Sequence, residues 1–225
     1  MKSLISFSIL IVFNFALAFS VFSQNDLYYA KLHSTNIFNN SAVIKPDSLP
    51  YLGQTPPDTV PELFGPGFIS STTAAEYSIC FSQDGKEIYF SRNTIGVSNT
   101  IWWTQYVNSA WTVPVLAPFT ENYYNSEAFI TYDNQKMYFI SARDTSTNYQ
   151  IYYMSRSGSN WSTPVKLTAP FSLDKTKMFP TLASNGNIYF TQWDLSNKSY
   201  FYTARNINGV FETPVKLSSN INAYF

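Results

Sequence analysis

Charged side chains are scarce in this chain, and neither sign is in excess. They make up 12% of the 225 residues, and 14 basic side chains balance 14 acidic ones. Nucleic-acid binding depends on clustered basic groups that neutralise phosphates, and no such cluster is present. We therefore expect no nucleic-acid partner.

Histidine and cysteine each occur once, as His33 and Cys80. One cysteine cannot form an internal disulfide, and the apolar run 77–81 around Cys80 predicts a buried thiol. One histidine leaves no Ser-His-Asp triad and no plausible zinc set, and no glycine-rich phosphate loop is present. We expect no catalytic residue, no metal and no cofactor.

The N-terminus carries an apolar segment. Lys2 is the only charge in residues 1–23, and small residues precede a cleavage point before Gln24. This pattern predicts a signal peptide over 1–23. The alternative is an uncleaved membrane anchor, since Leu4–Phe22 is nearly long enough to span a bilayer. Either way we expect export, to the periplasm or the cell surface.

Residues 24–61 are polar and rich in proline, which predicts an extended linker or lead-in. The following segment, 62–70, is apolar and contains Gly65-Pro66-Gly67. We expect it to form a lone outer strand ahead of the first full repeat.

One short pattern then occurs three times. Its aromatic runs begin at Ile101, Ile151 and Phe201, and its prolines are Pro114, Pro164 and Pro214, so both sets are spaced by 50 residues. A fixed period of this length indicates an array of similar structural units. No segment shows a sustained helical period.

Each repeat contains four short apolar runs. The first two are joined by turn residues, Asp84-Gly85, Asp133-Asn134 and Asn185-Gly186, and turn chemistry accounts for these side chains. Four strands in about fifty residues are typical of a β-propeller blade. The repeated proline falls in the fourth strand, which is the outer edge of a blade, where a missing N–H is harmless.

The predicted fold is therefore all-β. We expect a partial propeller over 62–225, with three four-stranded antiparallel blades at about 76–120, 127–170 and 178–220. Propellers close with about four to eight blades, so three blades form an incomplete or open ring. We expect the chain to be a fragment; the alternative is a homo-oligomer that completes the ring.

The run Phe81–Phe90, with Ser82 and Asp84-Gly85-Lys86 ahead of an aromatic strand, resembles a TolB-type, WD40-like propeller repeat. The resemblance covers about 62–225 and is weaker in the second and third repeats. The lead-in around Tyr51–Pro57 is similar to exported members from Bacteroidetes-type bacteria. The resemblance implies a propeller that serves interaction, often in the periplasm. The repeats lack the Asp-box pattern of sialidase-type propellers.

Two glutamates are candidate ligand-binding residues. Glu76 and Glu127 lie 51 residues apart, at the start of the first strand, which lines the channel of a propeller. Paired carboxylates could serve glycoside hydrolysis or hold a cation. The alternative is that they satisfy neighbouring backbone groups, and the third repeat has Met178 at the matching place.

Two arginines are the other candidates. Arg92 and Arg143 follow the second strand and could bind an anionic ligand at the rim; the alternative is ion pairing with loop carboxylates such as Asp144. The pairs Trp102-Trp103 and Tyr152-Tyr153 suggest sugar stacking. However, adjacent strand residues point to opposite faces, so we favour packing between blades.

These observations lead to two functional hypotheses. The first is an exported propeller without catalysis that binds a protein, a peptide or a cell-envelope glycan. The second is the propeller part of a larger hydrolase, a glycosidase or a peptidase, whose catalytic part lies elsewhere.

Overall fold

The computed structural model describes residues 51–94, 99–120, 123–144, 148–194, 196 and 198–223. Contacts divide the chain into units Met1–Val43 and Ile44–Phe225, and all described residues belong to the second unit. The predicted signal peptide and most of the predicted linker lie outside the described residues. Within these ranges, no helix has the length and apolar character needed to cross a bilayer.

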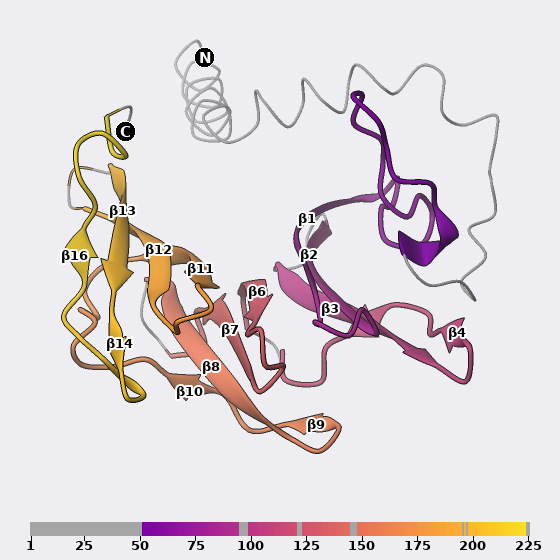
Figure 1. The fold of residues 1–225 in the computed structure, drawn as a ribbon. Coiled ribbons are helices and arrows are strands. Elements are labelled where there is room, and N and C mark those ends of the chain that lie inside the picture. The colour runs from indigo at the N-terminus through magenta and orange to yellow at the C-terminus, as the bar shows by residue number, and fades with distance from the viewer. Residues whose placement is uncertain are drawn as a thin grey trace, which may run out of the picture. The chain divides into compact units, whose positions relative to one another are not determined.

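Three antiparallel sheets of the same topology follow one another along the chain (Figure 1). Blade 1 consists of β1 (Ala74–Phe81), β2 (Glu87–Thr94), β3 (Thr100–Val107) and β5 (Val115–Leu116). Blade 2 consists of β6 (Asn125–Ile130), β7 (Lys136–Ser141), β8 (Gln150–Ser157) and β10 (Val165–Lys166). Blade 3 consists of β11 (Lys177–Leu182), β12 (Ile188–Trp193), β13 (Ser199–Ala204) and β16 (Val215–Lys216). The predicted all-β fold with three four-stranded blades is confirmed.

The third and fourth strands of each blade are joined by a short hairpin extension. It contains β4 (Ala110–Trp111) in blade 1, β9 (Asn160–Trp161) in blade 2, and β14 (Asn206–Ile207) with β15 (Val210–Phe211) in blade 3. Each repeated proline lies between this hairpin and the two-residue outer strand. Because β5, β10 and β16 each pair only with the third strand, they are the outer edges of their blades, as predicted. The prediction that the prolines lie within these strands was wrong, since each proline comes directly before its outer strand.

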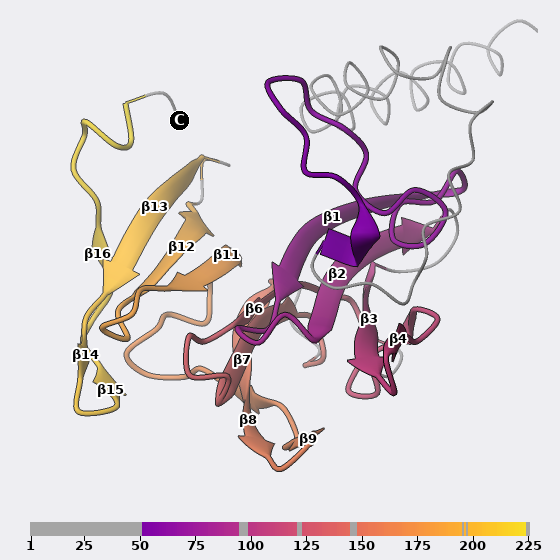
Figure 2. The ribbon, with the colours of Figure 1, turned by 45° about the vertical axis from the view of Figure 1, so that its right-hand side comes forward.

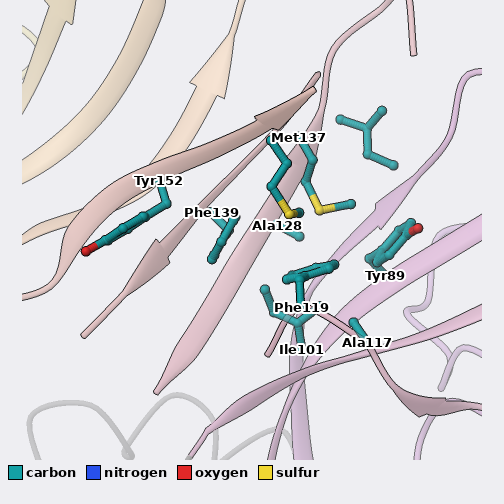
Figure 3. Packing of buried hydrophobic residues seen from close by; sticks show 10 residues of the cluster. Tyr89, Ile101, Ala117, Phe119, Ala128, Met137, Phe139 and Tyr152 are labelled. Atoms are coloured by element: carbon teal, nitrogen blue, oxygen red, sulfur yellow. The ribbon is translucent and has the colours of Figure 1, made fainter. Parts of the chain in front are cut away.

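Apolar clusters fill the space between consecutive blades. Between blades 1 and 2, Tyr89 and Ile101 pack with Met137 and Phe139. Figure 3 shows the rings of Phe119 and Phe139 together in this cluster, with centroids 5.3 Å apart. Neighbouring residues serve opposite faces, since Tyr138 belongs to the cluster between blades 2 and 3. The strand period of two therefore supplies both faces of a blade.

The aromatic pairs follow this rule. Trp103 packs between blades 1 and 2, whereas Trp102 packs on the opposite face of blade 1. Tyr152 faces blade 1 and Tyr153 faces blade 3. The prediction of packing between blades is confirmed for Trp103, Tyr152 and Tyr153. Trp102 instead packs in the cluster that holds Phe68 and Ile69, ahead of blade 1.

The prediction of a lone strand over 62–70 was wrong. This segment forms turns and an isolated bridge between Pro66 and Ser70. Gly65 has a φ of +56° and its carbonyl accepts hydrogen bonds from the N–H groups of Phe68 and Ile69. The glycines favour this tight turn over a ladder. The apolar side chains of the segment then pack on blade 1.

Candidate functional site at the first strands

The first strands β1, β6 and β11 are neighbours in both ribbon views, and β6 contacts the other two (Figure 2). Each contains a β-bulge at which the register with the second strand shifts. The bulge places a residue in the left-handed region: Ser78 at φ 50°, Glu127 at φ 61° and Phe179 at φ 55°. A bulge re-aims the side chain that it carries. These three residues are therefore structurally equivalent.

This equivalence corrects the predicted pairing of the two glutamates. Glu76 lies two residues before the bulge residue of its strand, at the position that Asn125 and Lys177 occupy in blades 2 and 3. Glu127 is itself the bulge residue. The two carboxylates do not share a place in the repeat.

Glu76 forms an ion pair with Arg92. The Nε of Arg92 donates to Oε1 of Glu76 at 2.8 Å, and the backbone N–H of Ser71 donates to Oε2 at 3.1 Å. Arg92 also donates to the carbonyl of Ile69 at 2.9 Å and lies over the ring of Trp102, 4.4 Å from its centroid. The pair thus fastens the segment ahead of β1 to the sheet.

Arg143 likewise binds the segment ahead of the first strand in blade 2. Its Nη2 donates to Oδ1 of Asn125 at 3.0 Å and to the carbonyl of Phe119 at 3.1 Å. The guanidinium lies over the ring of Tyr152, 5.2 Å from its centroid. Asp144, the expected partner, has an ion pair with Lys166. Ligand binding by Arg92 and Arg143 stays a prediction, and their observed contacts hold loops.

In blade 3 a buried lysine, Lys177, forms the hydrogen bonds to the preceding loop that an arginine forms in blades 1 and 2. Lys177 is 1% exposed, and its Nζ donates to Oε1 of Gln150 at 3.2 Å and to the carbonyls of Lys175 and Ser172. Burial lowers the pKa of Lys177 to about 8. Sequence reasoning missed this residue, because its only signal is its register with Glu76 and Asn125.

Glu127 connects all three blades. Its backbone N–H donates to Oγ of Ser91 in blade 1 at 2.9 Å, and its carboxylate accepts from the backbone N–H of Phe179 in blade 3 at 2.5 Å. The residue is 3% exposed. Burial raises the pKa of Glu127 to about 7, although the bond from Phe179 opposes this shift.

Tyrosines surround this carboxylate. Tyr124 and Tyr149 are stacked with ring centroids 4.4 Å apart, and Asn99 donates to the Tyr124 hydroxyl at 3.0 Å. Burial, and then the neighbouring Tyr124 and Glu127, raise the pKa values of Tyr77 and Tyr149. These phenols are held neutral, so they offer hydrogen bonds rather than charge.

Apolar side chains are exposed beside this cluster. Ile79 on β1 is 43% exposed and Phe179 on β11 is 46% exposed. In the described ranges, no group of three or more His, Cys, Asp or Glu side chains is placed to hold a metal ion. The arrangement provides exposed apolar surface beside hydrogen-bonding groups.

A polar hollow of about 270 Å³ lies between the turns of blades 1 and 2. Arg156 and Glu87 line it and form an ion pair at 2.5 Å, and Arg156 also donates to the carbonyl of Asn134 at 2.9 Å. The Asn134 side chain accepts from the N–H of Gln83 at 2.9 Å. These polar groups join the two blades to each other.

The turn carboxylates match their predicted role. Asp84 bonds the hydroxyl of Ser82 and Asp133 that of Thr131, each at 2.6 Å. The bond from Thr131 is the main cause that lowers the pKa of Asp133. Asn185 accepts from the N–H of Asn187 at 3.0 Å. Turn geometry explains all three side chains.

Comparison with known proteins finds similarity in structure only. No protein-family model matches the chain, and no curated protein does. Among solved structures, TolB from Acinetobacter baumannii is 20% identical with a TM-score of 0.43, over 62% of this chain and 33% of that one. The putative TolB from Agrobacterium tumefaciens is 18% identical with a TM-score of 0.47, over 65% of this chain and 51% of that one.

The chain thus spans about a third to a half of the solved TolB structures that it matches. The TolB-type resemblance predicted from Phe81–Phe90 agrees with these two structures. The blade architecture itself rests on the three repeated sheets and on the apolar clusters between them.

Proposed function

We propose that the chain is an exported, non-catalytic propeller module that binds a protein, a peptide or a cell-envelope glycan through the surface of its first strands. The observation that carries this proposal is that charged and apolar side chains have different roles at these strands. The charged side chains hold loops and blades together, while apolar side chains are left exposed.

Two features support binding at this surface. Ile79 and Phe179 present apolar area on strands that are neighbours of β6. Tyr77 and Tyr149, only partly buried, add phenol groups beside them. Aromatic and aliphatic groups with a few convergent polar groups are typical of binding sites. The apolar segment over 1–23 supports export.

The hydrolase alternative is less favoured by the same contacts. A glycosidase needs two carboxyl groups that flank one bond. Glu76 pairs with Arg92, Glu127 bonds the backbone of Phe179, and these two glutamates occupy different places in their repeats.

A binding assay with substitutions tests the proposal. The immobilised chain is presented with an array of short unstructured peptides and, separately, with purified peptidoglycan. We expect saturable binding to one of them, weakened about tenfold or more by Ile79→Asp or Phe179→Asp, which is about 1.4 kcal/mol. Val113→Asp, at an outer edge and 75% exposed, is the matched control.

Two outcomes would count against the proposal. One is the absence of saturable binding to either probe, or binding that Val113→Asp weakens equally. The other is hydrolysis of a glycan or peptide substrate that Glu127→Gln abolishes, which would favour the hydrolase alternative.

A further inference from the structure

The outer half of blade 1 has no charged residue in its sequence. None occurs between Arg92 and Glu121, a stretch that contains β3, the β4 hairpin and β5. The matching stretches of the other two blades do contain charges, which are Arg143, Asp144, Arg156 and Lys166 in blade 2 and Asp194, Lys198, Arg205, Glu212 and Lys216 in blade 3. Since the three blades have the same strand order, this difference is not a requirement of the fold. It distinguishes the outer surface of blade 1 from that of its neighbours.

The difference includes the outer strand itself. Leu116 in β5 occupies the place that Lys166 has in β10 and Lys216 has in β16, because each of them pairs with the matching residue of its third strand. Leu116 is 50% exposed, and Val113 and Val115 beside it are 75% and 51% exposed. Natural edge strands commonly carry lysine, which prevents them from pairing with another sheet. This protection is present in β10 and β16 and absent from β5.

The backbone of Leu116 is directed away from its own sheet. The N–H of the next residue, Ala117, donates to the carbonyl of Ile101 in β3 at 2.9 Å. Because successive residues of an antiparallel strand direct their backbone groups to opposite sides, the N–H and C=O of Leu116 point outwards. Among the described residues, β5 has no strand partner besides β3, and these two groups form no other hydrogen bond. The outer side of β5 is therefore available to a further strand.

The charge pattern of the three outer strands indicates which strand this is. Two-fold pairing of identical edges brings the central residue opposite its own copy. With Leu116 at the centre, leucine meets leucine, and the two copies exchange both backbone hydrogen bonds. The same pairing would place Lys166 or Lys216 opposite itself, and like charges directly opposite each other destabilise a strand pair. The ion pair of Lys166 with Asp144 does not remove this barrier, because pairing would take it out of water.

We propose that the outer edge of blade 1 is a dimerisation surface, on which β5 pairs antiparallel with β5 of a second copy about a two-fold axis at Leu116. Val113 and Val115 add apolar contact beside the axis. A strand of two residues gives a small interface, so the association is reversible and depends on protein concentration. β1 and β5 are opposite edges of their sheet. The proposal therefore does not rest on the proposed function, and either can fail alone.

Amide hydrogen exchange in the unaltered chain tests the proposal without a substitution. The amide of Leu116 is compared at low and at high protein concentration, with sedimentation measured on the same samples. We expect a mass of two copies at high concentration, with exchange at Leu116 slowed about tenfold or more. The outward amides of Lys166 and Lys216 are the matched controls, and their exchange should not depend on protein concentration.

A substitution tests the role of the missing charge. Leu116→Lys gives β5 the residue that β10 and β16 have, and it should raise the dissociation constant of the dimer about tenfold or more. The matched control is Leu173→Lys, at an apolar side chain that is 43% exposed and lies outside this edge. It should leave the dissociation constant unchanged. The amide of Ala117 should keep its exchange protection in Leu116→Lys, which would show that β5 still pairs with β3.

Three outcomes would overturn the proposal. The first is an unaltered chain that sediments as a single copy at every concentration, even if an added extended peptide slows exchange at Leu116, because the edge would then serve a different partner. The second is a dimer in which exchange at Leu116 does not depend on concentration. The third is a dimer that Leu116→Lys and Leu173→Lys weaken equally. If Leu116→Lys loses the protection at Ala117, the exchange comparison in the unaltered chain decides alone.

Discussion

The Glu127 carboxylate accepts a 2.5 Å hydrogen bond from the backbone N–H of Phe179, which holds in blade 3 the same left-handed bulge position that Glu127 holds in blade 2. The bulge of one blade thus anchors the bulge of the next. This contact places an acidic group with a raised pKa at the junction of the three blades.

Glu127 should make the stability of the chain depend on pH. Its pKa is raised from 4.5 to about 7, so the stability it contributes is fully present below about pH 4.5 and is lost as pH rises to about 7. The full difference corresponds to about 3 kcal/mol. Urea unfolding across this range should show a smaller decline for Glu127→Gln. Glu62→Gln, at an exposed position, is the control, and identical curves for all three proteins would contradict the prediction.

Lys177 should change the stability of the chain with pH in the opposite direction. Burial lowers its pKa from 10.5 to about 8, so the unfolded chain binds the proton more tightly and stability rises as pH increases between these values. Lys177→Met should flatten this rise. At pH 7 it should destabilise the chain by about 1–3 kcal/mol, because carbonyl acceptors lose their donor. Denaturant unfolding measures both effects, and the exposed Lys198→Met should reproduce neither.

Phe139→Ala should be among the costliest single substitutions. The ring is 0% exposed and lies in the cluster between blades 1 and 2. Removing it leaves a cavity, with an expected cost of about 3–5 kcal/mol. Phe179→Ala, at a ring that is 46% exposed, should cost clearly less. Thermal unfolding compares the two, and equal losses would argue against the interface as described.

Gly65→Ala should destabilise the turn segment 62–70, which lies ahead of blade 1. An added Cβ would lie 3.0 Å from Cγ1 of Ile69 at a φ of +56°. Gly209→Ala shares the left-handed strain, at φ +88°, but meets nothing within 4 Å. We expect Gly65→Ala to destabilise by about 1 kcal/mol more than this control. Faster amide exchange at Ile69 should accompany the loss; equal effects of the two variants would contradict it.

The period, the turns and the alternating faces could be predicted from the sequence because each has a local chemical signal. Asp84-Gly85 marks a hairpin, and Trp102-Trp103 alternates by strand geometry. The bulges have no such signal, since Ser78, Glu127 and Phe179 share no property that favours a left-handed residue. Missing the bulge led to the wrong pairing of Glu76 with Glu127.

The hairpin extensions were missed for a related reason. Trp111 and Trp161 read as the start of the outer strand, but they end short hairpins and pack back towards the preceding layer. Trp161 donates to the hydroxyl of Tyr89 in blade 1 at 2.9 Å. Only tertiary contacts distinguish this arrangement from a continuous strand.

The cations that hold the loops have a consequence for the evolution of the repeat. Arg92 lies within β2, Arg143 follows β7, and Lys177 begins β11. Each of them nevertheless donates to a carbonyl of the loop ahead of the first strand of its blade. The requirement is fixed in space, whereas the position that meets it has moved from blade to blade. An alignment of the three repeats will therefore place these cations in different columns. Their shared role, a hydrogen bond to a carbonyl of the preceding loop, is visible only in the structure.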